Sequence, residues 1–294
     1  MRMFRTIRRV KAGWVIGGRF VMLDRIGIGG TSRVWRAWDQ REGRYCAAKL
    51  VRQSAGTSML RVVRERALRL AHPHILTPYA WCTTEDDDVL LAMDLVRGGS
   101  LETLLGDYGR LPPAYAAEVL DQMLAALSHI HTLGVVHRDV KPANVLLEPS
   151  PVGAPHARLG DFGIALSGDG ERLTTTGFAV GTPGYLAPEV LDWAPPGPAQ
   201  DLYAAGMVCW RMLTGKGDPE PRQWVGPPPL DVPPSLWRVV AHLCAQRPQD
   251  RPAGAATARR ALSACGLRLD FPVRTVDGEP LQIFDHLGPP PTSA

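Results

Sequence analysis

Two short stretches, HRDVKPAN at residues 137–144 and DFG at residues 161–163, decide how this chain folds. The first brings a histidine, two cations, a carboxylate and an amide together, directly after a long segment with helical spacing of apolar residues. An aspartate in a loop is commonly no more than a turn or capping residue. The interpretation of Asp139 and Asp161 therefore depends on the motifs that surround the two stretches.

Upstream, a glycine-rich turn and a lone lysine lie in a region of expected strands. GIGGTSRV at residues 27–34 can bring backbone N–H groups close to phosphate, because glycine has no Cβ. No Gly-Lys-Ser/Thr follows and a strand comes next, which excludes a Walker A loop and a dinucleotide fingerprint. Lys49 stands in an otherwise apolar strand, where a lysine needs an anion. The ordinary alternative for the glycine-rich stretch is a plain hairpin turn. The ordinary alternative for Lys49 is a lysine on an edge strand that points to solvent.

Downstream, the remaining motifs follow in order. They are GTPGYLAPE at residues 181–189, Asp201 at the start of an apolar segment, and Arg251 within the stretch RPQDRP. Together with the upstream motifs, this ordered set resembles the protein kinase family, and specifically the bacterial eukaryotic-like Ser/Thr kinases. The resemblance covers about residues 15–267. It implies that Arg251 pairs with Glu189.

The resemblance implies an α+β, two-lobed protein-kinase-like fold, with a small β-rich N-lobe that has one main helix and a larger helical C-lobe. The expected organisation is a basic N-terminal arm at residues 1–14, a kinase domain at 15–267 and a C-terminal tail at 268–294. Within the domain, the N-lobe takes about 15–94, the hinge about 94–98 and the C-lobe about 99–267.

Apolar patterning places the expected elements along the chain. Short apolar runs predict strands at Phe20–Arg25, Arg33–Ala37, Tyr45–Val51 and Val89–Met93. Helical spacing predicts helices at Leu60–Leu70, Pro113–Leu133, Leu202–Leu213 and Ala255–Ala264. The proline-rich stretch at residues 225–234 must be irregular. The tail is too apolar for a plain linker and is expected to dock on the body or on a partner; its apolar residues are Phe271, Val273, Leu281, Ile283 and Phe284.

Composition excludes several classes of protein. The net charge of +4 arises from five cations in the first twelve residues, so the remainder is near neutral and does not suit nucleic acid. This arm is either a solvated terminus or a contact for anionic surfaces. Five scattered cysteines argue against a disulfide framework. No apolar run predicts a membrane span or a signal peptide, so a soluble cytoplasmic protein is expected.

Lysine and asparagine are rare in this chain, and those that occur fall largely on motif positions. Two of the four lysines are Lys49 and Lys141, and the only asparagine is Asn144. A compact ammonium suits the two lysine positions better than a planar guanidinium, and an amide oxygen suits Mg²⁺. This pattern favours a working kinase over a kinase fold without activity.

The resemblance implies a role for each motif residue in phosphoryl transfer from ATP with Mg²⁺, or with Mn²⁺ in its place. Lys49 would hold the α- and β-phosphates, Asp139 would accept or orient the substrate hydroxyl proton, and Lys141 would steady the γ-phosphate. Thr182 would support Asp139 and Lys141. The implied catalytic residues are Lys49, Glu65, Asp139, Lys141 and Thr182, and the implied metal ligands are Asn144 and Asp161.

Nucleotide binding is assigned by the same resemblance. Met93 would be the gatekeeper, and the backbone of residues 94–96 would form hydrogen bonds to adenine. The implied ATP-binding residues are Ile26, Gly27, Gly29, Gly30, Val34, Ala47, Lys49, Met93, Asp94, Val96 and Leu146.

Two positions depart from the family pattern. Ser32 replaces the third glycine of the turn, which still permits a hairpin. Glu65 is the only acid between Gln53 and Ala71, and it stands closer to His72 than the family usually allows. Glu65 either pairs with Lys49 or is a solvated residue on a helix face.

The segment before Gly181 carries a candidate regulatory site. Thr174 and Thr176 lie there, and Arg138 precedes Asp139, as in kinases that autophosphorylation switches on. The resemblance allows a homodimer in which one chain phosphorylates the other. The alternative is a threonine-rich loop without this role.

Three functions stay open at this point. The first is an active Ser/Thr protein kinase with unidentified protein substrates. The second is a pseudokinase or regulatory docking module, supported by the spacing around Glu65 and by the proline-rich residues 217–234. The third, a small-molecule kinase, is disfavoured by the complete segment at residues 181–189. His129 and His131 lack a third ligand, so core or surface histidines are expected there and not a metal site.

Overall fold

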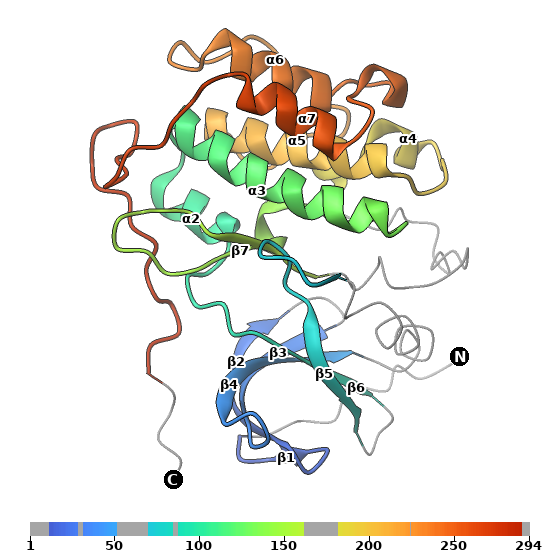
Figure 1. Cartoon of the computed structure of the whole chain (residues 1–294), viewed down its shortest axis with the longest axis vertical. Helices are drawn as coiled ribbons and strands as arrows, with labels where there is room; N and C mark the ends of the chain where they lie inside the picture. Colours follow the sequence, from blue (N-terminus) through green and yellow to red (C-terminus); the bar gives the residue numbers. More distant parts are fainter. Residues whose placement is uncertain are drawn as a thin grey trace.

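The computed structural model describes residues 12–28, 32–51, 70–84, 88–161, 182–223 and 225–289. The chain forms a small lobe built on a curled β-sheet and a larger lobe built mainly of helices (Figure 1). Residues 94–98 connect the last strand of the small lobe to the first helix of the large one. The expected two-lobed fold is confirmed.

The small lobe is one six-stranded antiparallel sheet with the strand order β1-β2-β3-β4-β6-β5. Its strands are β1 (Val15–Ile16), β2 (Phe20–Ile28), β3 (Ser32–Asp39), β4 (Arg44–Val51), β5 (Pro78–Thr83) and β6 (Val89–Met93). Buried Phe20, Met22, Leu50 and Leu90 form its core. Every predicted strand is present, most of them longer than the apolar run indicated. The predicted helix Leu60–Leu70 lies outside the described residues, apart from Leu70.

The large lobe contains six α-helices and a two-stranded sheet among the described residues. The helices are α2 (Leu101–Tyr108), α3 (Pro113–Thr132), α4 (Pro188–Leu191), α5 (Pro198–Thr214), α6 (Pro234–Leu243) and α7 (Ala255–Ser263); the strands are β7 (Val145–Leu147) and β8 (Ala157–Leu159). α3 packs against both α5 and α7 (Figure 1). The three long predicted helices are therefore confirmed, with α5 extended at its start to Pro198.

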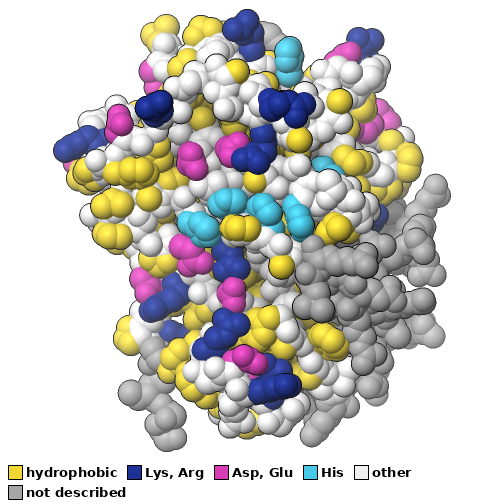
Figure 2. All heavy atoms as spheres, viewed as in Figure 1, with side chains coloured by type: hydrophobic (Ala, Val, Ile, Leu, Met, Phe, Trp, Pro, Cys, Tyr) yellow, Lys and Arg dark blue, Asp and Glu magenta, His cyan; other side chains and the backbone are white. Residues whose placement is uncertain are grey.

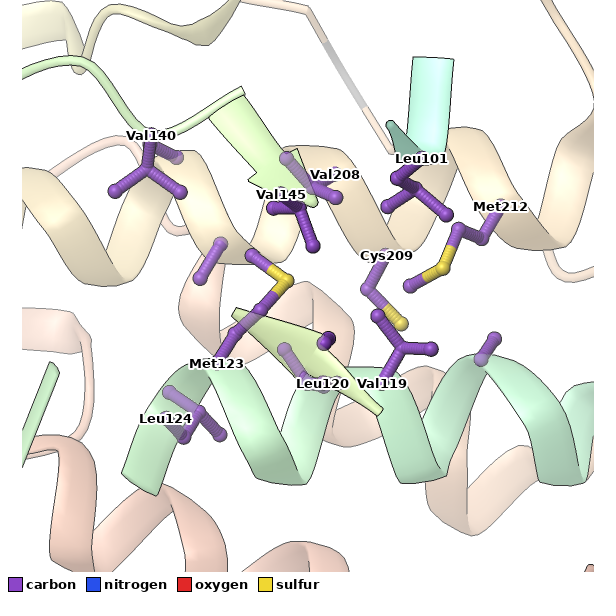
Figure 3. Packing of buried hydrophobic residues seen from close by; sticks show 14 of the residues in the cluster. Leu101, Val119, Leu120, Met123, Leu124, Val140, Val145, Val208, Cys209 and Met212 are labelled. Carbon is purple, nitrogen blue, oxygen red and sulfur yellow. The ribbon is translucent and has the colours of Figure 1, made fainter. Parts of the chain in front are cut away.

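Side chains from α3 and α5 interlock at the centre of the large lobe (Figure 3). Leu120 and Met123 of α3 point toward Val208 and Cys209 of α5, and Val145 of β7 lies beside them. All five are fully buried or nearly so. Because β7 follows the HRDVKPAN stretch directly, this core holds the loop that carries the motif.

Local signals explain where the helices start and stop. The side chain of Ser100 accepts a hydrogen bond from the N–H of Thr103 and caps α2. α5 ends at Gly215, whose φ of 65° is left-handed. Proline occupies the first turn of α6, so the irregular stretch ends at Pro234 as a helix begins. α2 and α6 are short, and the sequence did not predict them.

The C-terminal tail docks on the body of the protein. Val273, Leu281 and Ile283 are buried within the core of the large lobe, whereas Phe271 and Phe284 stay exposed. Of the two outcomes expected for the tail, docking on the body is the one observed. No helix in the described ranges is long and apolar enough to cross a membrane.

Candidate active site

Lys49 lies in the middle of the small-lobe sheet and makes an ion pair with Asp161 of the large lobe. On β4 it stands between Val34 of β3 and Leu91 of β6, and its side chain is 12% exposed. A mostly buried ammonium needs an anion, and the carboxylate of Asp161 supplies one. This pair joins the two lobes at the candidate site. Glu65, the partner that the sequence predicted for Lys49, lies outside the described residues.

Asp161 follows β8 and has an unusual backbone conformation. Its φ is 62°, a left-handed value that is uncommon for residues other than glycine. The preceding Gly160 donates its N–H to the backbone oxygen of Asn144 at 2.8 Å. That hydrogen bond places the residue before Asp161 beside the Asn144 backbone, so two expected metal ligands lie on adjoining segments.

Asp139, Lys141 and Asn144 form one hydrogen-bonded group. The side-chain NH₂ of Asn144 donates to the backbone oxygen of Asp139 at 2.7 Å and to its Oδ2 at 2.9 Å. The ammonium of Lys141 lies 2.9 Å from the same Oδ2. The amide oxygen of Asn144 has no hydrogen bond to another described residue. The amide is thus oriented with its nitrogen toward Asp139 and its oxygen available as a ligand.

A buried carboxylate on α5 holds the loop that contains this group. Asp201 accepts hydrogen bonds of 2.8 Å from the N–H groups of His137 and Arg138 and is also 2.8 Å from Nε2 of His131. Arg138 has a left-handed φ of 69°, a conformation that the two bonds help to fix. The sequence placed Asp201 at the helix start but gave no sign of the contact with His131.

The ring of His137 joins the loop to the residue before Asp161. Its Nε2 lies 2.9 Å from the backbone oxygen of Gly160, and the side chain is fully buried. Burial lowers the pKa of His137 despite the nearby carboxylates. The ring is therefore neutral near pH 7 and acts as a structural link between the two motif loops.

The hinge begins at Asp94, whose side chain is bound by two arginines. Its carboxylate makes ion pairs with Arg44 of β4 at 2.7 Å and with Arg158 of β8 at 2.9 Å. Burial alone would raise the pKa of Asp94, but the two guanidinium groups hold it below its usual value. Since one arginine comes from each lobe, Asp94 ties the lobes together at the hinge. Sequence reasoning missed both arginines.

The other expected ATP-binding residues lie on the strands around this hinge. Gly27 stands opposite Val34 between β2 and β3, and Ala47 stands opposite Met93 between β4 and β6. Ile26 of β2 and Leu146 of β7 are half-buried, one in each lobe, and Val96 lies in the connection between the lobes. Gly29 and Gly30 lie outside the described residues.

The segment after the undescribed residues 162–181 is fixed to the large lobe. Arg251, with a 0% exposed side chain, binds Glu189 through two hydrogen bonds of 2.6 and 2.8 Å. The expected pairing of these residues is confirmed. Thr182 is half-buried, and no hydrogen bond within the described part of the chain joins it to Asp139 or Lys141. Its supporting role stays a prediction.

Four histidines form a row between the lobes, visible on the face in Figure 2. The ring of His72 lies 5.3 Å from that of His129 and 5.7 Å from that of His74, which in turn lies 5.2 Å from His156. Burial lowers the pKa of His72 and of His74. Within the described ranges, no group of three or more potential ligands could hold a metal ion. The four rings pack against one another at the lobe boundary, with His72 and His74 neutral near pH 7.

Comparison with known proteins shows which family the sequence resembles. A family profile described as "Protein kinase domain" matches residues 20–221. The chain is 35% identical over 276 residues to Serine/threonine-protein kinase PkaA of Streptomyces coelicolor, covering 83% of this chain and 49% of that protein. It is 32% identical over 266 residues to Serine/threonine-protein kinase PknA of Mycobacterium tuberculosis, covering 82% of this chain and 60% of that protein. The chain thus spans about half to three-fifths of the length of these relatives.

Proposed function

The chain belongs to the protein kinase family, among the bacterial eukaryotic-like Ser/Thr kinases, and we propose that it transfers the γ-phosphoryl group of ATP to serine or threonine hydroxyls of protein substrates. The observation that carries this proposal is the group formed by Asp139, Lys141 and Asn144. The backbone hydrogen bond from Gly160 to Asn144 joins its loop to the segment of the Lys49–Asp161 pair. Each charge that phosphoryl transfer requires has a side chain there.

The residues fit a nucleotide bound with a divalent cation. Asn144 offers its amide oxygen and Asp161 a carboxylate that is part exposed, and hard oxygen ligands suit Mg²⁺, with Mn²⁺ as the alternative. The bound ion would neutralise charge on the phosphates. Lys49 would bind the α- and β-phosphates, because its ammonium lies in an apolar strand and needs an anionic partner.

Asp139 is the proposed base for the acceptor hydroxyl. In the reaction, the hydroxyl oxygen bonds to the γ-phosphorus, the bond to the β–γ bridging oxygen breaks, and the proton passes toward Asp139. Asn144 holds Asp139 by one hydrogen bond to its backbone oxygen and one to its carboxylate Oδ2, and Lys141 is placed to balance negative charge as it develops. Thr182 is proposed to assist this pair from the following segment.

Adenine is proposed to bind along the hinge. The backbone oxygen of Asp94 and the N–H of Val96 would form its hydrogen bonds, next to Met93. The two arginines on the Asp94 side chain support this arrangement, because they fix the hinge residue from both lobes. The apolar surfaces above and below the ring are proposed to come from Ile26, Val34, Ala47 and Leu146.

Phosphorylation of Thr174 or Thr176 is proposed to activate the enzyme, by transfer between two copies of the chain. Both threonines lie outside the described residues. Arg138 supports the proposal: its Nε is buried and has no hydrogen-bond partner among the described residues, so a dianionic phosphate would give this donor an acceptor. Mass spectrometry after incubation with MgATP tests this. An active enzyme with both threonines unmodified would refute it.

A phosphotransfer assay tests the proposed function as a whole. The wild-type chain is incubated with MgATP labelled at the γ-phosphate and with a generic basic protein. Asp139→Asn and Lys49→Ala are expected to lower transfer at least 100-fold, because each removes a charge that the transition state needs. Equal labelling by wild type and Asp139→Asn would sink the proposal. No observation favours the pseudokinase alternative, since the described catalytic positions keep their charged side chains.

Location and surface contacts stay predictions. All five cysteines are free thiols, which suits the reducing cytoplasm proposed for this chain. The basic arm at residues 1–14 is proposed to be solvated, with contact to anionic surfaces as the alternative; residues 1–11 lie outside the described part of the chain.

A further inference from the structure

The C-terminal segment runs along one side of both lobes and ends beside the small one (Figure 1). Residues 271–288, here called the strap, begin eight positions after the last residue of α7, pass the hinge and reach β3. The catalytic motifs do not involve these residues. The contacts of the strap divide into three groups: with the large lobe, with the hinge and with the small lobe.

The first group fixes the strap to the large lobe. Ser150 and Ile283 exchange two backbone hydrogen bonds of 2.8 and 2.9 Å, and the N–H of Val273 donates to the oxygen of Val152 at 2.9 Å. The hydroxyl of Tyr108 donates to the oxygen of Gln282 at 3.1 Å and accepts from its N–H at 3.0 Å. Together with the buried apolar side chains described above, these bonds make this part of the strap an integral piece of the lobe.

The second group lies at the hinge. The N–H of His286 donates to the backbone oxygen of Arg97 at 2.9 Å. The guanidinium of Arg97 makes an ion pair with Asp285 at 2.6 Å and donates to the oxygen of Gly288 at 3.1 Å. Arg97 directly follows Val96, the residue proposed to bind adenine. The strap is therefore attached to the same backbone segment that would hold the nucleotide.

The third group fixes the strap to the small lobe through one arginine. Arg36 of β3 is 5% exposed, and its Nη1 donates to the backbone oxygens of Leu287 and Gly288 at 3.2 and 3.1 Å. The rest of its guanidinium binds both carboxylate oxygens of Asp24 on β2, at 2.7 and 2.9 Å. Because Asp24 binds Nε and Nη2, it orients the planar guanidinium of Arg36 so that Nη1 points toward the strap.

Glycines at the crossing make room for the strap. A Cβ on Gly98 would lie 2.7 Å from Cγ2 of Ile283, and one on Gly99 would lie 2.9 Å from the ring of His286. A real Cβ does not approach other atoms so closely. A Cβ on Gly98 would also clash with the backbone oxygen of Leu147, and Gly99 has a left-handed φ of 76°, so both positions need glycine and the strap occupies the space beside them.

We propose that the strap is an intramolecular tie between the lobes, with Arg36 as the positioning residue of its small-lobe end. The tie limits rotation of the small lobe about the hinge and keeps the hinge backbone in the form that receives the nucleotide. Release of the strap leaves the lobes joined but less restrained, so the nucleotide must order them as it binds. Strap docking and nucleotide binding then favour each other.

Amide hydrogen exchange of the full chain without nucleotide tests the tie directly. Arg36→Met keeps most of the stem and removes the donors, and Asp285→Ala removes the hinge contact from the strap side. The matched control is Arg41→Met, an exposed arginine in the turn after β3. Both test variants are expected to exchange about 10-fold faster at the hinge and along β2 to β4, because these segments open more often. Faster exchange confined to residues 285–289 would overturn the proposal.

A second arm measures the affinity for MgATP and rests on the proposed function. Both test variants are expected to bind MgATP at least about 5-fold more weakly than the control, and Arg36→Lys to recover part of the loss by donating to one carbonyl. Reciprocally, MgATP should slow exchange at Ile283 and His286 in the wild type. Unchanged affinity in both variants would refute the coupling. If the wild type binds no MgATP, the proposed function fails, and the exchange result still decides whether the tie exists.

Discussion

The carboxylate of Asp201 accepts a hydrogen bond of 2.8 Å from the N–H of His137, so a buried position on α5 fixes the start of the loop that carries Asp139. A second bond to the N–H of Arg138 uses the other oxygen. Asp201 is 1% exposed, so bulk solvent does not reach the carboxylate. The orientation of the candidate base therefore depends on a residue that lies outside the substrate site.

Asp201→Asn keeps the shape of this side chain but replaces one acceptor oxygen with a donor. One backbone N–H is then left unsatisfied, which we expect to cost about 1–3 kcal/mol in the free energy of unfolding and up to about 100-fold in kcat through misplacement of the loop. Urea denaturation and the phosphotransfer assay measure the two effects. The control is Asp192→Asn, an exposed aspartate nearby. Wild-type stability and rate in Asp201→Asn would contradict this role.

Arg251→Met breaks the buried pair with Glu189. The lost partner leaves a carboxylate that is 15% exposed, and we expect about 3 kcal/mol of lost stability, the low end for a buried pair. The matched control lies in the same stretch: Arg247 is 71% exposed and pairs with Asp250, so Arg247→Met should leave the urea midpoint close to that of the wild type. Urea midpoints compare the two. Equal losses would mean that burial does not distinguish these ion pairs.

Substitution of Asn144 separates its two proposed tasks. Asn144→Ala removes the oxygen ligand and the two donors to Asp139, so the Mg²⁺ concentration for half-maximal rate should rise at least about 10-fold and kcat should fall. Asn144→Asp restores an oxygen ligand but not the donors. It is expected to need near wild-type Mg²⁺ while kcat stays low. Titration of the initial rate with Mg²⁺ gives both numbers. If Asn144→Ala responds to Mg²⁺ as the wild type does, the residue is no ligand.

Asp39 gives the small lobe a pH-dependent stability. Two hydrogen bonds of 2.7 Å from Arg19 outweigh burial and lower the pKa of Asp39 from 3.8 to about 2. A lowered carboxyl pKa stabilises the fold above the unfolded value and loses that contribution as pH falls through the folded value. The side chain is 0% exposed, so the contribution at pH 7 is about 2 kcal/mol.

Arg19→Met should therefore reduce stability by about 2 kcal/mol at pH 7, and the difference from the wild type should shrink between about pH 4 and pH 2. Unfolding by urea at a series of pH values measures it. The exposed Arg41, whose side chain makes no ion pair with a described residue, gives the control Arg41→Met. A difference that is constant down to pH 2 would show that Arg19 acts through packing and not through Asp39.

The sequence predicted those parts of the fold that depend on local patterns. Leu120, Met123 and Leu127 recur at helical spacing, and α3 forms where they stand. The glycine-rich turn, Lys49 and the loop motifs are recognisable because their chemistry needs fixed residues at fixed positions. α6 was missed because its ten residues begin inside a proline-rich stretch, and β5 because it starts at Pro78.

Contacts between residues far apart in the chain could not be predicted from the sequence. Asp94 could be assigned to the hinge, but nothing local indicates that Arg44 and Arg158 bind its side chain from opposite lobes. The same holds for Arg36, which is separated from Gly288 by 252 positions. Trp35, Arg36 and Ala37 of β3 are all buried, and no local pattern indicates what an arginine between two apolar residues will bind.

The small-lobe end of the strap is held by backbone oxygens. Arg36 binds the carbonyls of Leu287 and Gly288, and every amino acid carries such a carbonyl. Residues 287 and 288 can therefore be substituted without loss of the carbonyls that Arg36 binds. Gly98, in contrast, tolerates no larger residue beside Ile283. Comparable ties in other chains would escape a search by residue identity. An arginine on the third strand, glycines after the hinge and a tail of sufficient length would reveal them.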